Sequence, residues 1–133
     1  MKFLLYTDGG ARGNPGPAAI GVVLKNNKGE VVRELSSYIG VGTNNDAEYK
    51  ALVEGLTLST LKEITELEVF LDSELIVKQL KGLYKVKNER LKKYYLEVKI
   101  LEKNFSKVTY KHIKRHLNKE ADDLVNKALD VRI

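Results

Sequence analysis

The spacing of apolar residues divides the chain into five strand-like and four helix-like segments. Runs rich in β-branched and aromatic residues predict strands at Lys2 to Asp8, Ala18 to Lys25, Val31 to Ile39, Leu67 to Asp72 and Val108 to Ile113. Apolar residues at helical spacing predict helices from Asn45 to about Leu61, Ser73 to about Leu83, Asn88 to about Lys103 and Lys119 to the C-terminus.

The connections between these segments predict the topology. The breaks GARGNPGP and NNKG resemble hairpin connections, so the first three strands should form an antiparallel meander. Strands four and five each follow a helix, which favours parallel crossover connections. We therefore expect an α/β fold in which about four helices flank a mixed five-stranded sheet, three antiparallel strands then two parallel ones. The length of 133 residues, with no linker or repeat, fits a single domain over residues 1–133.

Charge and composition limit the kinds of partner and of functional site that the chain can have. The chain has 23 Lys and Arg against 18 Asp and Glu, a net charge of +5 that suits a polyanion, although many small proteins are basic for solubility alone. It has no cysteine, which excludes disulfides, zinc fingers and thiol nucleophiles. The N-terminal apolar run from Phe3 to Tyr6 is too short for a signal peptide or a membrane span. We expect a cytoplasmic protein without a membrane partner.

Four acids stand where a folded protein rarely places a carboxylate for structure alone. Asp8 and Asp72 end apolar strands, and helical periodicity puts Glu48 and Asp122 on apolar faces, whereas Asp123 falls on the wet side. A buried carboxylate is costly unless it is paired or neutralised. Asp8 before Gly9 also fits a turn, and Asp72 or Ser73 can be a helix N-cap, so these two acids each have a structural explanation, whereas the helix acids Glu48 and Asp122 are harder to explain in this way.

A shared cation would explain all four acids together. If the first and fourth strands are neighbours, Asp8 and Asp72 lie at matching ends, and the two helices can bring Glu48 and Asp122 over them. Oxygen donors without cysteine suit Mg²⁺ or Mn²⁺ rather than zinc. A pair of such ions about 4 Å apart can activate a water on one side of a phosphodiester and stabilise the leaving oxygen on the other. Hydrolysis of a nucleic acid is the expected chemistry.

The sequences around these acids resemble one family. YTDGGARGNPGPAAIG, TNNDAEYKAL, FLDSELIVKQL and NKEADDLVNKAL follow in the order and spacing of type 1 ribonuclease H, and the resemblance runs from about Lys2 to Leu129. It implies a ribonuclease H-like fold and a metal-dependent endonuclease that cuts the RNA strand of an RNA/DNA hybrid, largely independently of sequence, leaving 3′-hydroxyl and 5′-phosphate ends. It also implies that the acids bind two Mg²⁺ or Mn²⁺ ions, and we expect a monomer.

The resemblance extends to substrate-binding residues. It places Asn14, Asn44 and Asn45 along the RNA strand, where amides can meet 2′-hydroxyls, and Thr43 and Asn88 at a phosphate of the DNA strand. Each also has a structural explanation, because Asn14 precedes a proline in a turn and residues 43–45 can cap a helix.

The chain departs from the family pattern in three places, one of which is the absence of Trp, which leaves Tyr84 as only a candidate to pack on the DNA sugars. Val41 stands where relatives often have arginine, so the DNA-strand pocket is expected to be weaker. The linker LKGLYKVKNER is too short for the basic protrusion of some bacterial members. Many members have a catalytic histidine before the last motif. His112 matches by simple spacing, but a shortened loop favours His116, and Arg115 can fill the same electrostatic role.

Three other functions compete with a hybrid-specific nuclease. The closest is a nuclease that also cuts double-stranded RNA, because both duplexes offer a shallow minor groove and 2′-hydroxyls. A non-catalytic hybrid-binding module is disfavoured because all four acids are present. A ribonuclease domain of a longer polymerase-type protein is disfavoured by the start at Met1.

Overall fold

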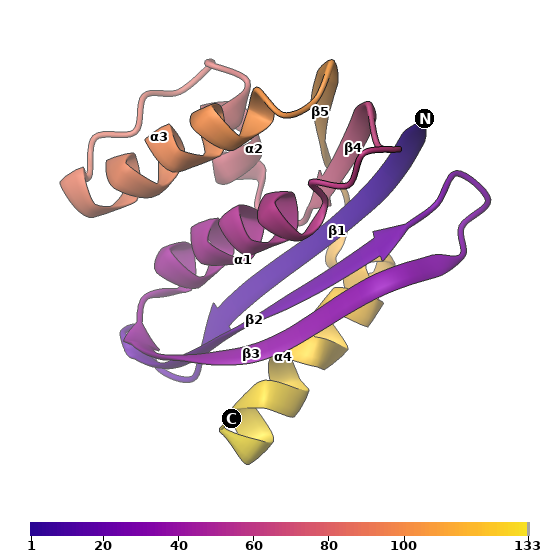
Figure 1. The fold of residues 1–133 in the computed structure, drawn as a ribbon. Helices are drawn as coiled ribbons and strands as arrows, with labels where there is room; N and C mark the ends of the chain where they lie inside the picture. Colours follow the sequence, from indigo (N-terminus) through magenta and orange to yellow (C-terminus); the bar gives the residue numbers. More distant parts are fainter. Residues whose placement is uncertain (133) are drawn as a thin grey trace.

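Five strands form one sheet in the order β3-β2-β1-β4-β5 (Figure 1). The computed structural model describes residues 1–132. β2 pairs antiparallel with both β1 and β3, whereas β4 pairs in parallel with both β1 and β5, which confirms the predicted topology. The strands span Lys2–Ala11 (β1), Gly16–Lys25 (β2), Val31–Gly42 (β3), Glu66–Leu71 (β4) and Lys107–His112 (β5).

The helices cover the two faces of the sheet unequally. α1, α2 and α3 lie on one side, and α4 lies alone on the other, against β2 and β3 (Figure 1). The helices span Asn44–Leu58 (α1), Glu74–Leu80 (α2), Glu89–Glu102 (α3) and Lys119–Val131 (α4), with a short 3-10 helix, η1, at Arg115–Asn118. Within residues 1–132, every helix is too short or too polar to cross a membrane.

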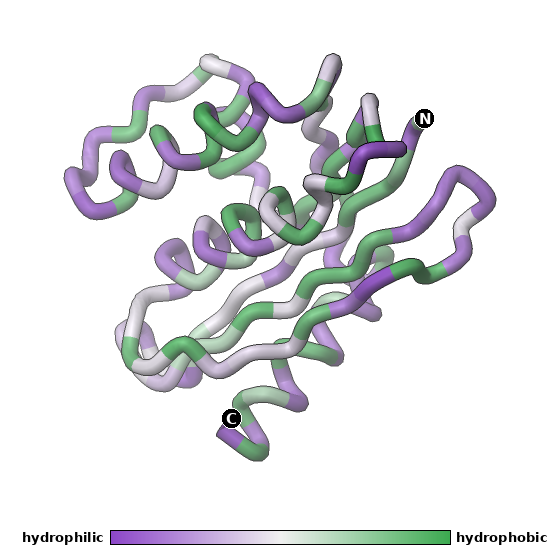
Figure 2. Tube along the Cα trace, in the orientation of Figure 1, coloured by the Kyte–Doolittle hydropathy of each residue, from purple (hydrophilic) through white to green (hydrophobic). Residues whose placement is uncertain are grey.

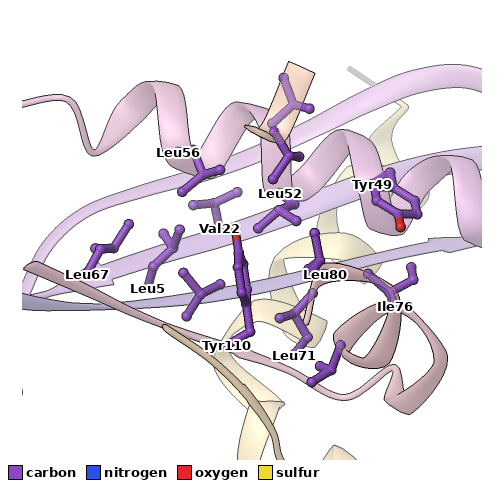
Figure 3. Packing of buried hydrophobic residues seen from close by; sticks show 14 of the residues in the cluster. Leu5, Val22, Tyr49, Leu52, Leu56, Leu67, Leu71, Ile76, Leu80 and Tyr110 are labelled. Atoms are coloured by element: carbon purple, nitrogen blue, oxygen red, sulfur yellow. The ribbon is translucent and has the colours of Figure 1, made fainter. Parts of the chain in front are cut away.

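The main hydrophobic core fills the space between α1 and the sheet (Figure 3). Leu52 and Leu56 of α1 pack with Leu5, Val22 and Leu67 of the strands, and all five side chains are fully buried. Burying one such side chain contributes about 1.5–3 kcal/mol. The N-terminal part of β1 and the middle of β2 are correspondingly hydrophobic, while the loop joining β2 to β3 is hydrophilic (Figure 2). The packing therefore fixes α1 over the centre of the sheet.

Several element ends differ from the predicted ones. β1 continues beyond Asp8 to Ala11, because these last residues pair with β2, and this excludes the explanation of Asp8 as a turn residue. α2 ends at Leu80 rather than near Leu83, because Gly82 takes a left-handed φ of 78°. α4 begins at Lys119 as predicted, but the sequence pattern did not predict η1 before it.

Two glycines let helices on opposite faces touch the strands beneath them. A methyl group added at Gly9 of β1 would lie 2.2 Å from the carbonyl carbon of Ala47 in α1. One added at Gly21 of β2 would lie 2.1 Å from the carbonyl oxygen of Ala121 in α4. Neither position has room for a side chain. Because Gly9 follows Asp8, and Gly21 is the strand partner of Asp8, both helices approach the sheet closely beside this one residue.

Candidate active site

Asp8 and Asp72 come from the two central parallel strands. β1 and β4 pair up to Tyr6 and Phe70, and each acid lies two residues further along its chain, so the two carboxylates share one end of the sheet. Asp72 follows the last residue of β4, and the N-cap of α2 is Ser73, whose side chain accepts the Ile76 N–H. The carboxylate of Asp72 is therefore not the cap of that helix.

Glu48 completes a compact cluster of three acids. It follows Ala47 at the close contact with Gly9, and its Oε1 accepts the N–H of Gly9 at 3.3 Å. Its Oε2 is buried and has no hydrogen-bond partner within residues 1–132. Asp8, Glu48 and Asp72 each offer an oxygen, and these three atoms lie within 4.8 Å of one another. An orphaned carboxylate oxygen inside such a cluster is the arrangement expected of a cation site.

Asp122 lies at the edge of the cluster rather than in it. Its side chain is 24% exposed and 3.4 Å from Nη2 of Arg115. It lines the same cavity as the other three acids, whereas Asp123 pairs with Lys119 at 2.7 Å in solvent. The periodicity that favoured Asp122 over Asp123 is therefore confirmed for their placement. Asp122 is not among the three acids whose oxygens lie within 4.8 Å.

The clustering of acids opposes their ionisation. Burial raises the pKa of Asp8 to about 7, and the nearby charge of Asp72 adds to the effect. Burial, then the charge of Asp8, also raises the pKa of Glu48 well above its usual value. Without a cation, the cluster therefore retains a proton near neutral pH. A bound cation would displace that proton, since its positive charge offsets the repulsion between the carboxylates.

Asn118, which the sequence analysis did not single out, holds Asp72 in place. It is 1% exposed at the end of η1. Its Nδ2 donates to Oδ2 of Asp72 at 3.1 Å and to the backbone oxygen of Thr7 at 2.9 Å. One amide thus joins β1, the end of β4 and the start of α4. The available signal was its position one helical turn before Asp122.

The acids open onto a cavity of about 400 Å³. α4 contributes both polar and apolar residues to the cavity lining. The lining residues are Asp8, Gly9, Gly10, Ala11, Arg12, Asn44, Glu48, Asp72, Arg115, Asp122, Val125, Asn126 and Leu129. Of the predicted substrate-binding residues, Asn44 alone lies in this lining.

The predicted RNA-strand residues form a bonded arrangement at the rim. The N–H of Asn44 donates to Oδ1 of Asn14 at 3.0 Å, and Oδ1 of Asn44 accepts the N–H of Ala11 at 2.8 Å. These bonds support the turn explanation for Asn14, and both side chains are exposed at the surface. Asn45 is half-buried in the first turn of α1. Their contact with RNA stays a prediction.

Thr43 and Asn88, the predicted DNA-strand residues, are helix caps. Thr43 and Asp46 form a capping box at the start of α1, and Oδ1 of Asn88 accepts the N–H groups of Arg90 and Leu91 at the start of α3. Each cap uses the acceptor oxygen of its side chain and leaves a donor, the Thr43 hydroxyl or the Asn88 amide, for another partner. Structure and binding are therefore compatible at both positions.

The histidines lie outside the lining of the cavity. His112 ends β5, with Nδ1 3.8 Å from Oε2 of Glu74. His116 lies in η1, as expected from a shortened loop, and is exposed. Arg115, which precedes it, lines the cavity. The catalytic role of His116 stays a prediction, and Arg115 is the basic residue of this segment that reaches the acids.

Comparisons with known proteins agree with this geometry. The family model described as reverse transcriptase-like matches residues 6–128. The bifunctional protein Rv2228c of Mycobacterium tuberculosis is 41% identical over 98% of this chain, and the chain spans only 36% of its length. Ribonuclease HI of Halobacterium salinarum is 39% identical over 94% of this chain, which spans 63% of it.

Solved structures share the whole fold. The crystal structure of RNase H1 from the halophilic archaeon Halobacterium salinarum is 37% identical, with a TM-score of 0.95 over 98% of this chain and 99% of its own. LC11-RNase H1, solved in complex with RNA/DNA hybrid, is 44% identical, with a TM-score of 0.91 over 98% of both chains. The family model, the sequence identities and the shared fold agree, and the chain therefore belongs to the type 1 ribonuclease H family.

Proposed function

We propose that this protein is an endonuclease that hydrolyses the RNA strand of RNA/DNA hybrids, leaving 3′-hydroxyl and 5′-phosphate ends. The observation that carries the proposal is the cluster of Asp8, Glu48 and Asp72, whose oxygens lie within 4.8 Å of one another on a cavity. Family membership supplies the substrate class, because LC11-RNase H1 was solved with such a hybrid bound.

The donor set fits a hard divalent cation. All the groups are carboxylates, and the orphaned Oε2 of Glu48 has no protein partner within residues 1–132. We propose that Asp8, Glu48, Asp72 and Asp122 hold two Mg²⁺ or Mn²⁺ ions, which would activate the attacking water and stabilise the leaving oxygen. Asn118 orients the carboxylate of Asp72 for this role.

The residues around the acids position the substrate. Asn14, Asn44 and Asn45 would follow the RNA strand and recognise its 2′-hydroxyls. Thr43 and Asn88 would bind a phosphate of the DNA strand through the donors that capping leaves over. Such contacts read shape and backbone, so cleavage should depend little on base sequence.

The basic charge is concentrated in one segment. Residues 78–103 contain nine Lys and Arg against three Glu, a net charge of +6, while the whole chain has +5. The rest of the molecule is therefore close to neutral, at −1. A basic surface along the linker and α3 supports a polyanionic duplex as substrate and predicts that binding weakens as salt increases.

The decisive experiment compares the wild type with Asp8→Asn and, as a matched control, Asp123→Asn. Each variant removes one carboxylate, but Asp123 lies in solvent, paired with Lys119. End-labelled RNA/DNA hybrid, double-stranded RNA and double-stranded DNA would be incubated with Mg²⁺, with Mn²⁺ and with chelator. We expect metal-dependent cleavage of the RNA strand of the hybrid by the wild type and Asp123→Asn, and none by Asp8→Asn.

The other outcomes identify the competing functions. Binding of hybrid without cleavage under any metal would indicate a binding module and would refute the enzyme. Cleavage of double-stranded RNA, lost together with hybrid cleavage in Asp8→Asn, would broaden the substrate class at the same site. The single domain, the monomeric state and the cytoplasmic location stay predictions, which limited proteolysis, gel filtration and cell fractionation would test.

A further inference from the structure

An ion pair joins the starts of α1 and α3. Nε of Arg90 donates to Oδ1 of Asp46 at 2.6 Å, across 44 residues of sequence. The Asp46 side chain is 12% exposed, and that of Arg90 is 53% exposed. Hydrogen bonds from Thr43 and Arg90 outweigh the burial that opposes ionisation, so the pKa of Asp46 stays below its usual value. The pair is therefore charged near neutral pH.

This ion pair connects the two caps assigned above to the DNA strand. Oδ2 of Asp46 accepts the N–H of Thr43 at 3.0 Å, and Oγ1 of Thr43 accepts the N–H of Asp46 at 3.0 Å. Oδ1 of Asn88 accepts the N–H of Arg90 at 2.9 Å. Thr43 and Asn88 are thus each bonded to one member of the pair, and the pair fixes the position of one cap relative to the other.

Arg90 also has unused donors beside a depression in the surface. Within residues 1–132, its two Nη groups donate to no protein acceptor. The depression has a volume of about 350 Å³. It is lined by Ile39, Val41, Gly42, Asp46, Lys50, Arg90 and Tyr94. Lys50 is paired with Glu54 at 3.2 Å, and Val41 is 76% exposed but carries no charge.

We propose that Arg90 binds the DNA-strand phosphate together with Thr43 and Asn88, in place of the arginine that this chain lacks at position 41. The inference rests on the proposed function and names a further residue for it. A guanidinium can donate through Nε to one acceptor and through its Nη groups to another. Asp46 is the positioning residue, since it fixes the guanidinium through Nε.

The charges support this assignment. Both oxygens of Asp46 are engaged by protein donors, so the carboxylate is compensated while Arg90 is present. Removing the arginine would both delete a phosphate donor and leave the Asp46 anion beside the phosphate. The effect of Arg90→Ala should therefore exceed that of removing any unpaired lysine of the same helix.

Steady-state cleavage of hybrid would be compared for the wild type, Arg90→Ala, Arg90→Lys and Lys28→Ala. Lys28 is an exposed basic residue of the loop between β2 and β3, outside both the depression and the basic segment 78–103, so its loss matches the change in charge. We expect Arg90→Ala to raise KM by about tenfold or more with kcat nearly unchanged, because charge-assisted bonds have this magnitude. Lys28→Ala should change KM less than about threefold, and Arg90→Lys should fall between.

A second measurement excludes a merely structural role. Hybrids with a single neutral methylphosphonate at successive positions of the DNA strand would be bound by each protein in chelator. The wild type should lose about tenfold in affinity at one position, and Arg90→Ala should show a clearly smaller loss at that position, because only the Thr43 and Asn88 donors remain there. The slope of log affinity against log salt should also fall by nearly the value for one phosphate contact in Arg90→Ala, but not in Lys28→Ala.

The outcomes separate this inference from the proposed function. If the wild type neither binds nor cleaves hybrid, the proposed function fails and the role of Arg90 with it. If the wild type cleaves, but Arg90→Ala keeps the wild-type KM and the same methylphosphonate sensitivity, the inference alone is wrong. A lower kcat and a lower melting temperature at unchanged KM would show that Arg90 only braces α3, which also overturns it.

Discussion

Replacing Asp8 by asparagine should stabilise the metal-free protein at neutral and alkaline pH. Burial raises the pKa of Asp8 from 3.8 to about 7 in the folded protein. At about 1.4 kcal/mol for each pH unit, this corresponds to about 4 kcal/mol of destabilisation when the buried carboxylate is ionised. Burial also raises the pKa of the neighbouring Glu48, so ionisation of Glu48 opposes folding in the same way. The amide introduced by Asp8→Asn would be neutral at every pH and would avoid this cost.

The sign of the pH dependence follows from proton binding. Between pH 3.8 and about 7 the folded protein keeps the Asp8 proton that the unfolded chain has released. The contribution of Asp8 to the free energy of unfolding is therefore fully present below pH 3.8 and is lost as the pH rises through about 7. About 2.5 kcal/mol of the loss should fall between about pH 5 and about pH 8.

Urea unfolding in chelator at these two pH values, followed by circular dichroism, would measure the effect. The difference in free energy of unfolding between Asp8→Asn and the wild type should grow by about 2.5 kcal/mol from the lower to the higher pH. Asp123→Asn should differ from the wild type by less than about 0.5 kcal/mol at both. Added Mg²⁺ should stabilise the wild type and not Asp8→Asn. Parallel pH profiles for Asp8→Asn and the wild type would refute the account of a strongly desolvated Asp8.

Three further changes test the packing and the second layer of the site. Gly9→Ala should lower the free energy of unfolding by about 3 kcal/mol or more, because the methyl group meets the Ala47 backbone; an unchanged urea midpoint would contradict the close contact. Asn118→Ala should weaken Mg²⁺ affinity by about tenfold or more, because Asp72 would lose the bond that positions it. The affinity would be measured as the Mg²⁺ concentration that gives half of the maximal rise in melting temperature. An affinity equal to that of the wild type would refute the positioning role. Leu52→Ala should cost about 2–5 kcal/mol, and a loss below about 1 kcal/mol in chemical unfolding would contradict its full burial.

The parts of the fold that depend on local pattern were predictable from sequence. Apolar periodicity located all five strands and all four α-helices of residues 1–132, because burial against the sheet imposes that periodicity. The same argument separated Asp122 from Asp123. Element ends were less predictable, since they depend on pairing partners and on single residues such as Gly82.

Contacts between segments far apart in the sequence could not be predicted from local apolar periodicity. Asn118 and Asp72 are 46 residues apart, and Arg90 and Asp46 are 44 apart. These bonds depend on how η1 and the start of α3 follow the sheet, which no local spacing encodes. By sequence Gly9 fits a turn, whereas its role is to admit the backbone of α1. A turn and a close contact with a helix both favour a residue without a side chain, so the sequence alone does not distinguish these two roles of Gly9.

The packing before each of the four acids explains why their backbone positions do not depend on a bound cation. Each acid is preceded by a fully buried residue, namely Thr7, Ala47, Leu71 and Ala121. A buried residue fixes the backbone of the next residue. The packing that stabilises the sheet and helices therefore also determines the backbone position from which each acidic side chain extends. We therefore expect the protein to fold without metal, unlike small metal-dependent domains that unfold without their ion, while a bound cation would add stability. We expect a site held in this way to bind a cation without first ordering its ligands, so that most of the binding free energy would remain available to hold the cation against a substrate phosphate.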